Sequence, residues 1–270
     1  MKLHPLVIAI ALATGLAGCN QNNTPAGGTE TAVLDQAKLA AELDQLYADY
    51  WQANLKLSPI NATFIGDTRY NAELPNFFTA EYRQQTHDLN QSWLDKALAL
   101  DGSRLDGPGR ISYEIFVRER KLALESEKYP TWMLPIDQFN NIATFFPMLG
   151  SGTSAQPFKT VEDYDNWLKR GAAIPAIYDQ AIANMREGMK AGVVQPKPLM
   201  VKVIPQLDAI INDDPSKTTF WAPIANMPKD FSAEDQKRLT DAYRVMIAEQ
   251  LMPAYKRLRA FVADEYLPAT

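Results

Sequence analysis

The stretch "TVEDYDNWLKRGAAIPAIYDQAIANMREGMKAGVVQPK", residues 160–197, predicts one long helix whose two ends are both encoded locally. Thr160 and Asp163 have the spacing of a capping box, in which each side chain satisfies a free N–H group of the first turn. Gly192 is the expected C-terminal stop. Pro175 lies inside the pattern, and because it lacks an N–H and presses on the carbonyl four residues earlier, we expect a kink there rather than a break. The apolar face of this helix carries Tyr164, Trp167, Leu168, Tyr178, Ile182, Met185 and Met189.

Helical periodicity extends over most of the remaining chain. Further helices are predicted at about residues 32–56, from Thr79 to Gly102, after Gly107-Pro108, from Pro198 to Asp214, and from Ser232 to Tyr266 with a kink at Pro253. No region alternates with a period of two residues, so the predicted fold class is all-α. We expect a bundle of long helices, partly kinked at proline, with one long irregular loop.

The apolar faces of these helices form the expected core. In the helix after Gly107-Pro108 the apolar residues are Ile111, Ile115, Phe116 and Leu122. In the helix from Pro198 to Asp214 they are Met200, Val203, Leu207, Ile210 and Ile211. The last helix contributes Leu239, Tyr243, Met246, Ile247, Leu251, Ala254, Leu258 and Val262. We expect this last helix to pack against residues beyond Thr270 and therefore to leave an apolar patch exposed.

The long irregular loop is predicted at residues 129–158, a stretch rich in aromatic residues, proline and glycine but without helical periodicity. Loops of this length inside a compact domain are usually functional or packed over another element. Packing is the simpler interpretation, with Trp132, Phe139, Phe145 and Phe146 holding the loop on the bundle.

The first residues resemble a bacterial lipoprotein signal. Residues 1–18 combine Lys2 with an apolar run too short to span a bilayer, and "LAGC" places Cys19 where acylation would make it the new first residue. A plain secretory signal is the alternative, in which Cys19 stands there by chance. Residues 19–31 are predicted to be a flexible tether and residues 32–270 the helical domain. Because Asn20 follows the cysteine, we expect a lipid anchor in the outer membrane, facing the periplasm.

The composition restricts the chemistry. A net charge of −5 argues against a nucleic-acid partner. Cys19 is the sole cysteine and His4 and His87 the sole histidines, so neither an H-E-x-x-H zinc site nor a Ser-His-Asp triad can be assembled. His87 has polar helical neighbours and is interpreted as facing solvent.

Two other kinds of site are not established by the sequence. The segment "GSGTS" at residues 150–154 is only a weak match to a phosphate-binding loop, because the lysine that should follow is absent. A pair of carboxylates facing each other across a glycosidase cleft cannot be judged from sequence. We therefore predict no catalytic residue, no metal ligand and no cofactor in this chain.

Several segments resemble one known family. They are residues 160–197, "VIPQL" and "LMPAYKRLRAFVADEYLP", with weaker matches in "SPINATFIGDTRYNAELP" and "LPIDQ". Together they are similar to the bacterial family called domain of unknown function 885. The resemblance implies an exported, largely helical protein about twice this length, similar to zinc-dependent peptidases that carry an H-E-x-x-H-like motif in the C-terminal half. It also implies that this chain is the N-terminal half and forms one wall of a peptide cleft.

Two hypotheses remain open. In the first, the chain is the N-terminal part of a peptidase-like lipoprotein whose zinc-binding C-terminal half is missing. In the second, it is a complete, non-catalytic envelope lipoprotein that binds a peptide or protein partner. The last residues, "EYLPAT", end a helix at Leu267-Pro268, and the resemblance favours a cut at this point over a natural end.

Overall fold

The computed structural model describes the backbone of residues 27–270 and the side chains from residue 35 onward. Every regular element among these residues is a helix, which confirms the all-α prediction. The α-helices are α1 (Gly27–Leu57), α2 (Pro59–Phe64), α3 (Ala80–Leu98), α4 (Gly107–Ser126), α5 (Ile142–Leu149), α6 (Val161–Ala191), α7 (Lys197–Asp208), α8 (Ala222–Ala225), α9 (Ala233–Val245) and α10 (Met252–Ala260). No described helix is long and apolar enough to span a membrane.

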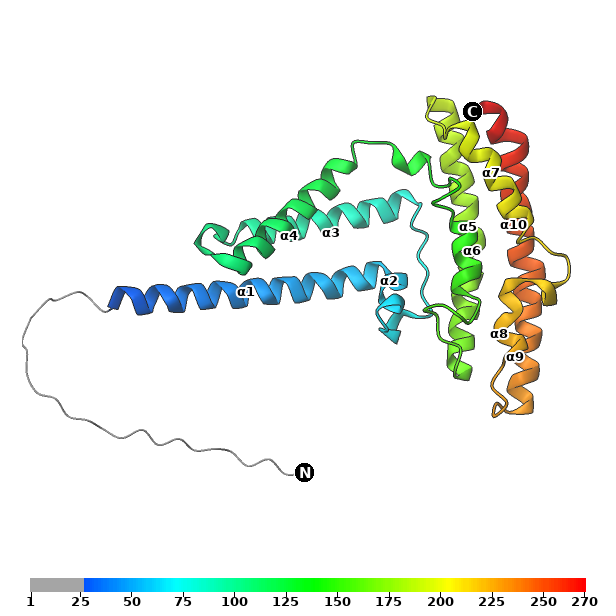
Figure 1. Cartoon of the computed structure of the whole chain (residues 1–270), viewed down its shortest axis with the longest axis horizontal. Coiled ribbons are helices and arrows are strands. Elements are labelled where there is room, and N and C mark those ends of the chain that lie inside the picture. Colours follow the sequence, from blue (N-terminus) through cyan, green and yellow to red (C-terminus); the bar gives the residue numbers. More distant parts are fainter. Residues whose placement is uncertain (1–26) are drawn as a thin grey trace, which may run out of the picture.

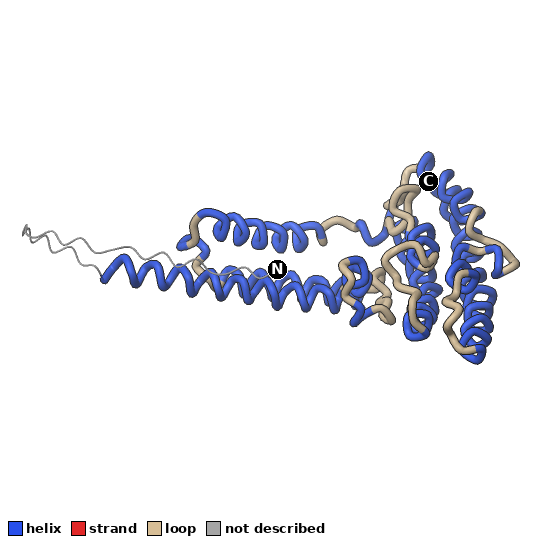
Figure 2. Tube along the Cα trace, turned by 60° about the horizontal axis from the view of Figure 1, so that its bottom comes forward, coloured by secondary structure: helices blue, strands red, loops and turns tan. Residues whose placement is uncertain are grey.

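The helices form two groups that cross each other (Figure 1). Helices α1, α3 and α4 run side by side, and α6, α7, α9 and α10 run across their end; Figure 2 shows the same division from another direction. The first group has small cores that contain Leu46, Leu94 and Val117. The second group has the large core of the molecule. Helix α2 and the loop after it lie where the two groups meet.

Helix α6 begins and ends as predicted. Thr160 and Asp163 form both bonds of the capping box, with distances of 3.2 Å from the Asp163 nitrogen to Oγ1 and 2.9 Å from the Thr160 nitrogen to Oδ2. Gly192 has a φ of 70°, the left-handed conformation that a helix stop requires. The helix continues through Pro175 without a break. Local sequence signals were therefore sufficient to define this element.

The last predicted helix is one continuous rod of four segments: α9, a π-helical segment η6 (Met246–Leu251), α10 and a second π-helical segment η7 (Phe261–Tyr266). Each π segment ends two residues before a proline, Pro253 or Pro268. A proline has no N–H to donate to the carbonyl oxygen four residues earlier. In a π turn that carbonyl oxygen accepts instead from the N–H of the fifth residue after it. The widened turn thus accommodates each proline within the rod.

The prediction of an exposed apolar patch on this rod is wrong. All eight of its predicted core residues are buried, and the rod packs against α6 and α7 within the described part of the chain. Val245 is the one large apolar residue of the rod that is exposed among the described residues, at 46%. Helix α4 exposes three of the apolar residues predicted for its core face: Ile111, Ile115 and Leu122 are 58%, 55% and 45% exposed. Helix α4 packs on α3 through another face, which includes Val117, and this leaves Ile111, Ile115 and Leu122 exposed among the described residues.

The predicted loop at residues 129–158 contains a helix, α5, that the sequence reading missed. Asn141 caps it by accepting a hydrogen bond from the Ala143 nitrogen at 3.0 Å. Phe146 is fully buried, as the packing interpretation expected, whereas Phe139 is 78% exposed and does not hold the loop in place. An eight-residue helix is too short for periodicity to distinguish it from an apolar loop.

Candidate functional site

Arg170 on α6 joins the two helix groups. It is fully buried, and its guanidinium donates to the carbonyl oxygens of Tyr70 and Glu73 at 2.7 and 3.0 Å and to Thr63 Oγ1 and Gln156 Oε1 at 3.0 and 2.6 Å. Burial lowers the pKa of Arg170 to about 10, so the side chain stays charged at neutral pH. The four acceptors compensate the desolvation of this charge and fix the corner at residues 59–79 against α6.

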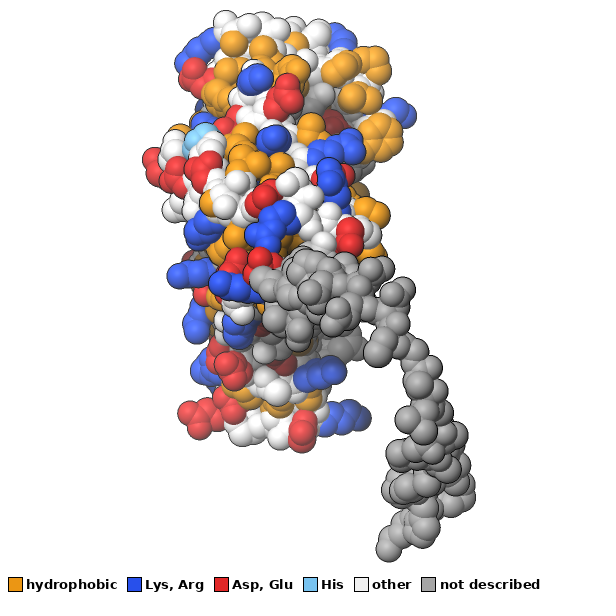
Figure 3. Space-filling model, turned by 90° about the vertical axis from the view of Figure 1, so that its left-hand side faces the viewer, with side chains coloured by type: hydrophobic (Ala, Val, Ile, Leu, Met, Phe, Trp, Pro, Cys, Tyr) orange, Lys and Arg blue, Asp and Glu red, His pale blue; other side chains and the backbone are white. Residues whose placement is uncertain are grey.

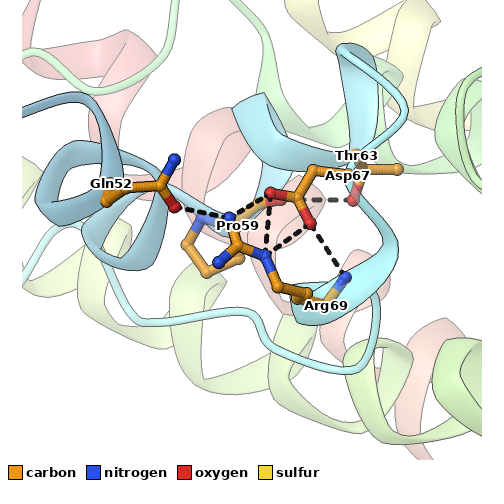
Figure 4. A network of polar contacts seen from close by, with 5 residues as sticks. All are labelled: Gln52, Pro59, Thr63, Asp67 and Arg69. Atoms are coloured by element: carbon orange, nitrogen blue, oxygen red, sulfur yellow. Dashed lines mark hydrogen bonds and ion pairs between the residues drawn. The ribbon is translucent and has the colours of Figure 1, made fainter. Parts of the chain in front are cut away.

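The exposed side of this corner carries a second polar network (Figure 4). Arg69 pairs with Asp67 through a two-pronged contact and reaches Gln52 Oε1 on α1 at 2.7 Å. The hydrogen bonds from Arg69 lower the pKa of the Asp67 carboxyl. Because the Arg69 side chain is 53% exposed and that of Asp67 17%, the pair lies at the surface, where it positions the turn more than it stabilises the fold.

A cavity of about 670 Å³ lies between α3 and the end of α4, and we call it the α3–α4 cavity. Its residues are Phe77, Ala80, Tyr82, Arg83, Gln84, Thr86, His87 and Asn90 on one side, and Ala123, Ser126, Glu127, Tyr129, Thr131 and Trp132 on the other. Helix α3 supplies His87, which the sequence analysis interpreted as facing solvent, and its polar neighbours Arg83, Gln84 and Asn90. These residues line a cavity because the chain after α4 crosses over them (Figure 1).

Two charged contacts shape the α3–α4 cavity. His87 Nδ1 lies 2.8 Å from Glu127 Oε2, and both side chains are 41% exposed. The guanidinium of Arg83 stacks on the ring of Trp132 at 4.5 Å and donates to the Phe78 carbonyl at 2.9 Å. His87 is therefore partly exposed, as expected, but it is also held by an acid and lines a cavity. Arg83, Glu127 and Trp132 were not identified from the sequence, because they come from three separate segments.

The described residues contain no group of three His, Cys, Asp or Glu side chains placed to hold a metal ion. Within the described part of the chain, the His87 imidazole forms a hydrogen bond with Glu127. The α3–α4 cavity therefore offers aromatic faces, a cation and an acceptor, which are the components of a binding site. Cys19, the predicted lipidation site, lies outside the described residues.

Comparison with known proteins identifies the family. A family model described as "Bacterial protein of unknown function (DUF885)" matches residues 59–270, which is most of the chain. The chain belongs to the DUF885 family. The match begins at α2, so it includes both groups of helices except α1. No curated protein matches the chain.

One solved structure has the same fold. It is the "putative lipoprotein from Colwellia psychrerythraea", with a TM-score of 0.66 and 15% sequence identity. The similarity covers 87% of this chain and 42% of that one, so this chain spans less than half the length of that protein. At this identity the comparison shows a shared fold.

The segments that carry the resemblance in the sequence lie in the matched range and come together in the structure. "SPINATFIGDTRYNAELP" provides three of the four acceptors of Arg170, and residues 160–197 provide Arg170 itself. "VIPQL" and the last segment place Leu207 and Tyr255 in the large core. These segments thus contribute the buried polar junction and part of the large core. One sequence signal of that junction was available, since Arg170 lies on the apolar face of its helix, three residues after Trp167.

Proposed function

We propose that the chain is the helical N-terminal part of a lipid-anchored protein of the cell envelope, and that its α3–α4 cavity holds a segment of a bound peptide. The observation that carries the peptide-binding part is the lining of the cavity. Aromatic faces stand beside a cation, Arg83, and an acceptor, Glu127, within about 670 Å³. A peptide offers the complementary groups, namely apolar side chains together with backbone carbonyl and N–H groups.

Replacement of Arg83 by alanine tests peptide binding. Random octapeptides on an array select a binding sequence, and titration calorimetry then measures its dissociation constant. Arg83→Ala removes the stacked cation and is expected to weaken binding at least about tenfold, or 1.4 kcal/mol. The control Arg118→Ala removes an exposed arginine of α4 and should bind as the wild type does. The proposal fails if no octapeptide binds, or if both variants bind equally well.

Anchoring through Cys19 is part of the proposal and rests on the lipobox-like "LAGC". Acyl chains contribute about 0.8 kcal/mol per buried methylene, so two or more chains hold a protein on a membrane stably. In cells, Cys19→Ser is expected to abolish incorporation of labelled fatty acid and to move the protein from the membrane fraction to the soluble fraction. Retention of the Cys19→Ser protein with the outer membrane would exclude lipidation as the anchor.

We propose that peptide hydrolysis is carried out by a segment that follows residue 270. An H-E-x-x-H motif in that segment would bind zinc, and the helices described above would form one wall of the cleft. The length of the Colwellia protein is compatible with such a segment. The gene downstream of codon 270 decides the matter: a continuing reading frame with that motif is expected, and a stop codon would favour a complete, non-catalytic binding protein. The 270-residue chain alone should hold no stoichiometric zinc.

A further inference from the structure

A second hollow runs between α1 and α4, on a different side of α4 from the α3–α4 cavity. It consists of two adjoining cavities of about 480 and 280 Å³ that share Tyr47 and Ser112. On α1 it extends from Ala40 to Trp51, a length of roughly 16 Å or three helical turns. We call it the α1–α4 groove.

The floor of the α1–α4 groove is aromatic. The rings of Tyr47 and Tyr50 both lie 5.1 Å from that of Phe116. Trp51 and Ile115 stand on either rim and are 44% and 55% exposed. The apolar surface continues over α4 to Ile111. Figure 3 shows the face of the molecule toward which α1 points, with hydrophobic side chains between charged ones.

One cation in the groove lacks a hydrogen-bonding partner. The guanidinium of Arg120 lies over the rings of Tyr50 and Phe116, at 4.3 and 5.3 Å. Its Nε and Nη1 atoms are shielded from solvent and have no acceptor among the described residues, and the same holds for the Tyr47 hydroxyl. The third nitrogen, Nη2, is not shielded in this way, so it is the atom through which the guanidinium can meet an acceptor from outside. A charged donor of this kind binds a carboxylate most strongly.

The arrangement of α1, α3 and α4 indicates the shape of what fits. These three helices lie side by side, with α3 packed on both α1 and α4. An additional helix seated between α1 and α4 would complete a four-helix bundle, the usual way in which such faces are buried. Because the exposed apolar surface extends from Trp51 across to Ile111, it is broad enough for the apolar face of a helix.

We propose that the α1–α4 groove docks an amphipathic helix of a partner protein whose apolar face carries one aspartate or glutamate directed at Arg120. Apolar side chains of that helix cover Trp51 and Ile115. The acid pairs with the guanidinium at the end of the groove near Trp51. Such a helix would need about three turns, and its remaining faces stay polar. The surface is separate from the α3–α4 cavity and does not depend on peptide binding there.

A display library tests this directly. It consists of 14-residue helices whose polar positions are fixed and whose four apolar-face positions are randomised. Selection on the full wild-type chain is expected to enrich aspartate or glutamate at one of the four positions. Selection on Arg120→Gln should lose that enrichment. Selection on Arg118→Gln, which alters an exposed arginine on the same helix, should retain it.

Affinities of one selected peptide complete the test. Exchange of its acid for the matching amide should weaken binding to the wild type at least tenfold, but leave binding to Arg120→Gln unchanged. Enrichment that is absent, or equal on both arginine variants, overturns the proposal. The proposal is also overturned if light scattering shows that the chain is a dimer and that Ile115→Asp makes it monomeric. In that case the groove is occupied by a second copy of the chain.

Discussion

Replacement of Arg170 by methionine is expected to lower the free energy of unfolding by roughly 3–5 kcal/mol. Methionine fills much of the same space but donates no hydrogen bond. The variant therefore leaves the Thr63 hydroxyl, the Gln156 amide oxygen and two backbone carbonyls without their charged donor in a buried site. Each such group costs about 1–3 kcal/mol, which exceeds the relief from no longer burying a charge. Urea unfolding followed by circular dichroism measures the effect.

Lys169 provides the matched control for Arg170. It precedes Arg170 on α6 and is exposed, so Lys169→Met should change the unfolding free energy by no more than about 0.5 kcal/mol. Arg170→Lys should lie between the two, because an ammonium group cannot reach all four acceptors at once. Equal stabilities of Arg170→Met and Lys169→Met would show that the buried junction does not stabilise the contact between the helix groups.

Replacement of Tyr255 by phenylalanine is expected to destabilise the fold by roughly 2–4 kcal/mol, although it removes a single oxygen atom. The Tyr255 hydroxyl donates to the Ala143 carbonyl at 2.7 Å and accepts from the Tyr178 hydroxyl at 2.8 Å. Within α5 the fourth residue after Ala143 is Pro147, which has no N–H to offer that carbonyl. Tyr255 thus replaces a missing helical donor, and its loss leaves two buried groups unpaired.

Tyr178→Phe is the comparison for Tyr255→Phe. It removes one hydrogen bond but leaves Tyr255 bonded to Ala143, so the expected cost is only about 0.5–1.5 kcal/mol. Thermal unfolding of the two variants should show the larger loss of stability for Tyr255→Phe, and the reverse order would refute the assigned donor directions.

Burial raises the pKa of both tyrosines above the ordinary value of 10.0. The unfolded chain therefore releases these protons first, and stability should fall as the pH rises above that value.

The helices and much of the core could be predicted from sequence because their determinants are local. A cap such as Thr160–Asp163 and a stop such as Gly192 act within one or two turns. Periodicity alone identified the eight apolar positions of the last helix, although it did not predict that α6 and α7 bury them. The predicted inward face of α4 failed for a related reason. Periodicity identifies an apolar stripe, but it does not say whether a neighbour covers that stripe.

The two proposed binding surfaces could not be predicted from local sequence. Residues of the α3–α4 cavity come from α3, from the end of α4 and from the segment after it, and no sequence spacing connects Arg83 with Trp132. The donors left over at Arg120 are recognisable only once the aromatic residues around them have been placed. Sequence did exclude a catalytic triad and an H-E-x-x-H site, because a count of histidines requires no geometry.

The sequence by itself determined the long helices, the caps of α6 and the lack of an H-E-x-x-H motif in these 270 residues, since each depends on neighbours within a few residues or on composition. Tertiary structure alone decided three matters: that Arg170 is a buried junction, that the polar face of α3 lines a cavity, and that α4 leaves an apolar face beside Arg120. Each depends on which distant segment covers a given side chain. Burial, and with it the free energy of every charge and hydrogen bond, is a property of that packing.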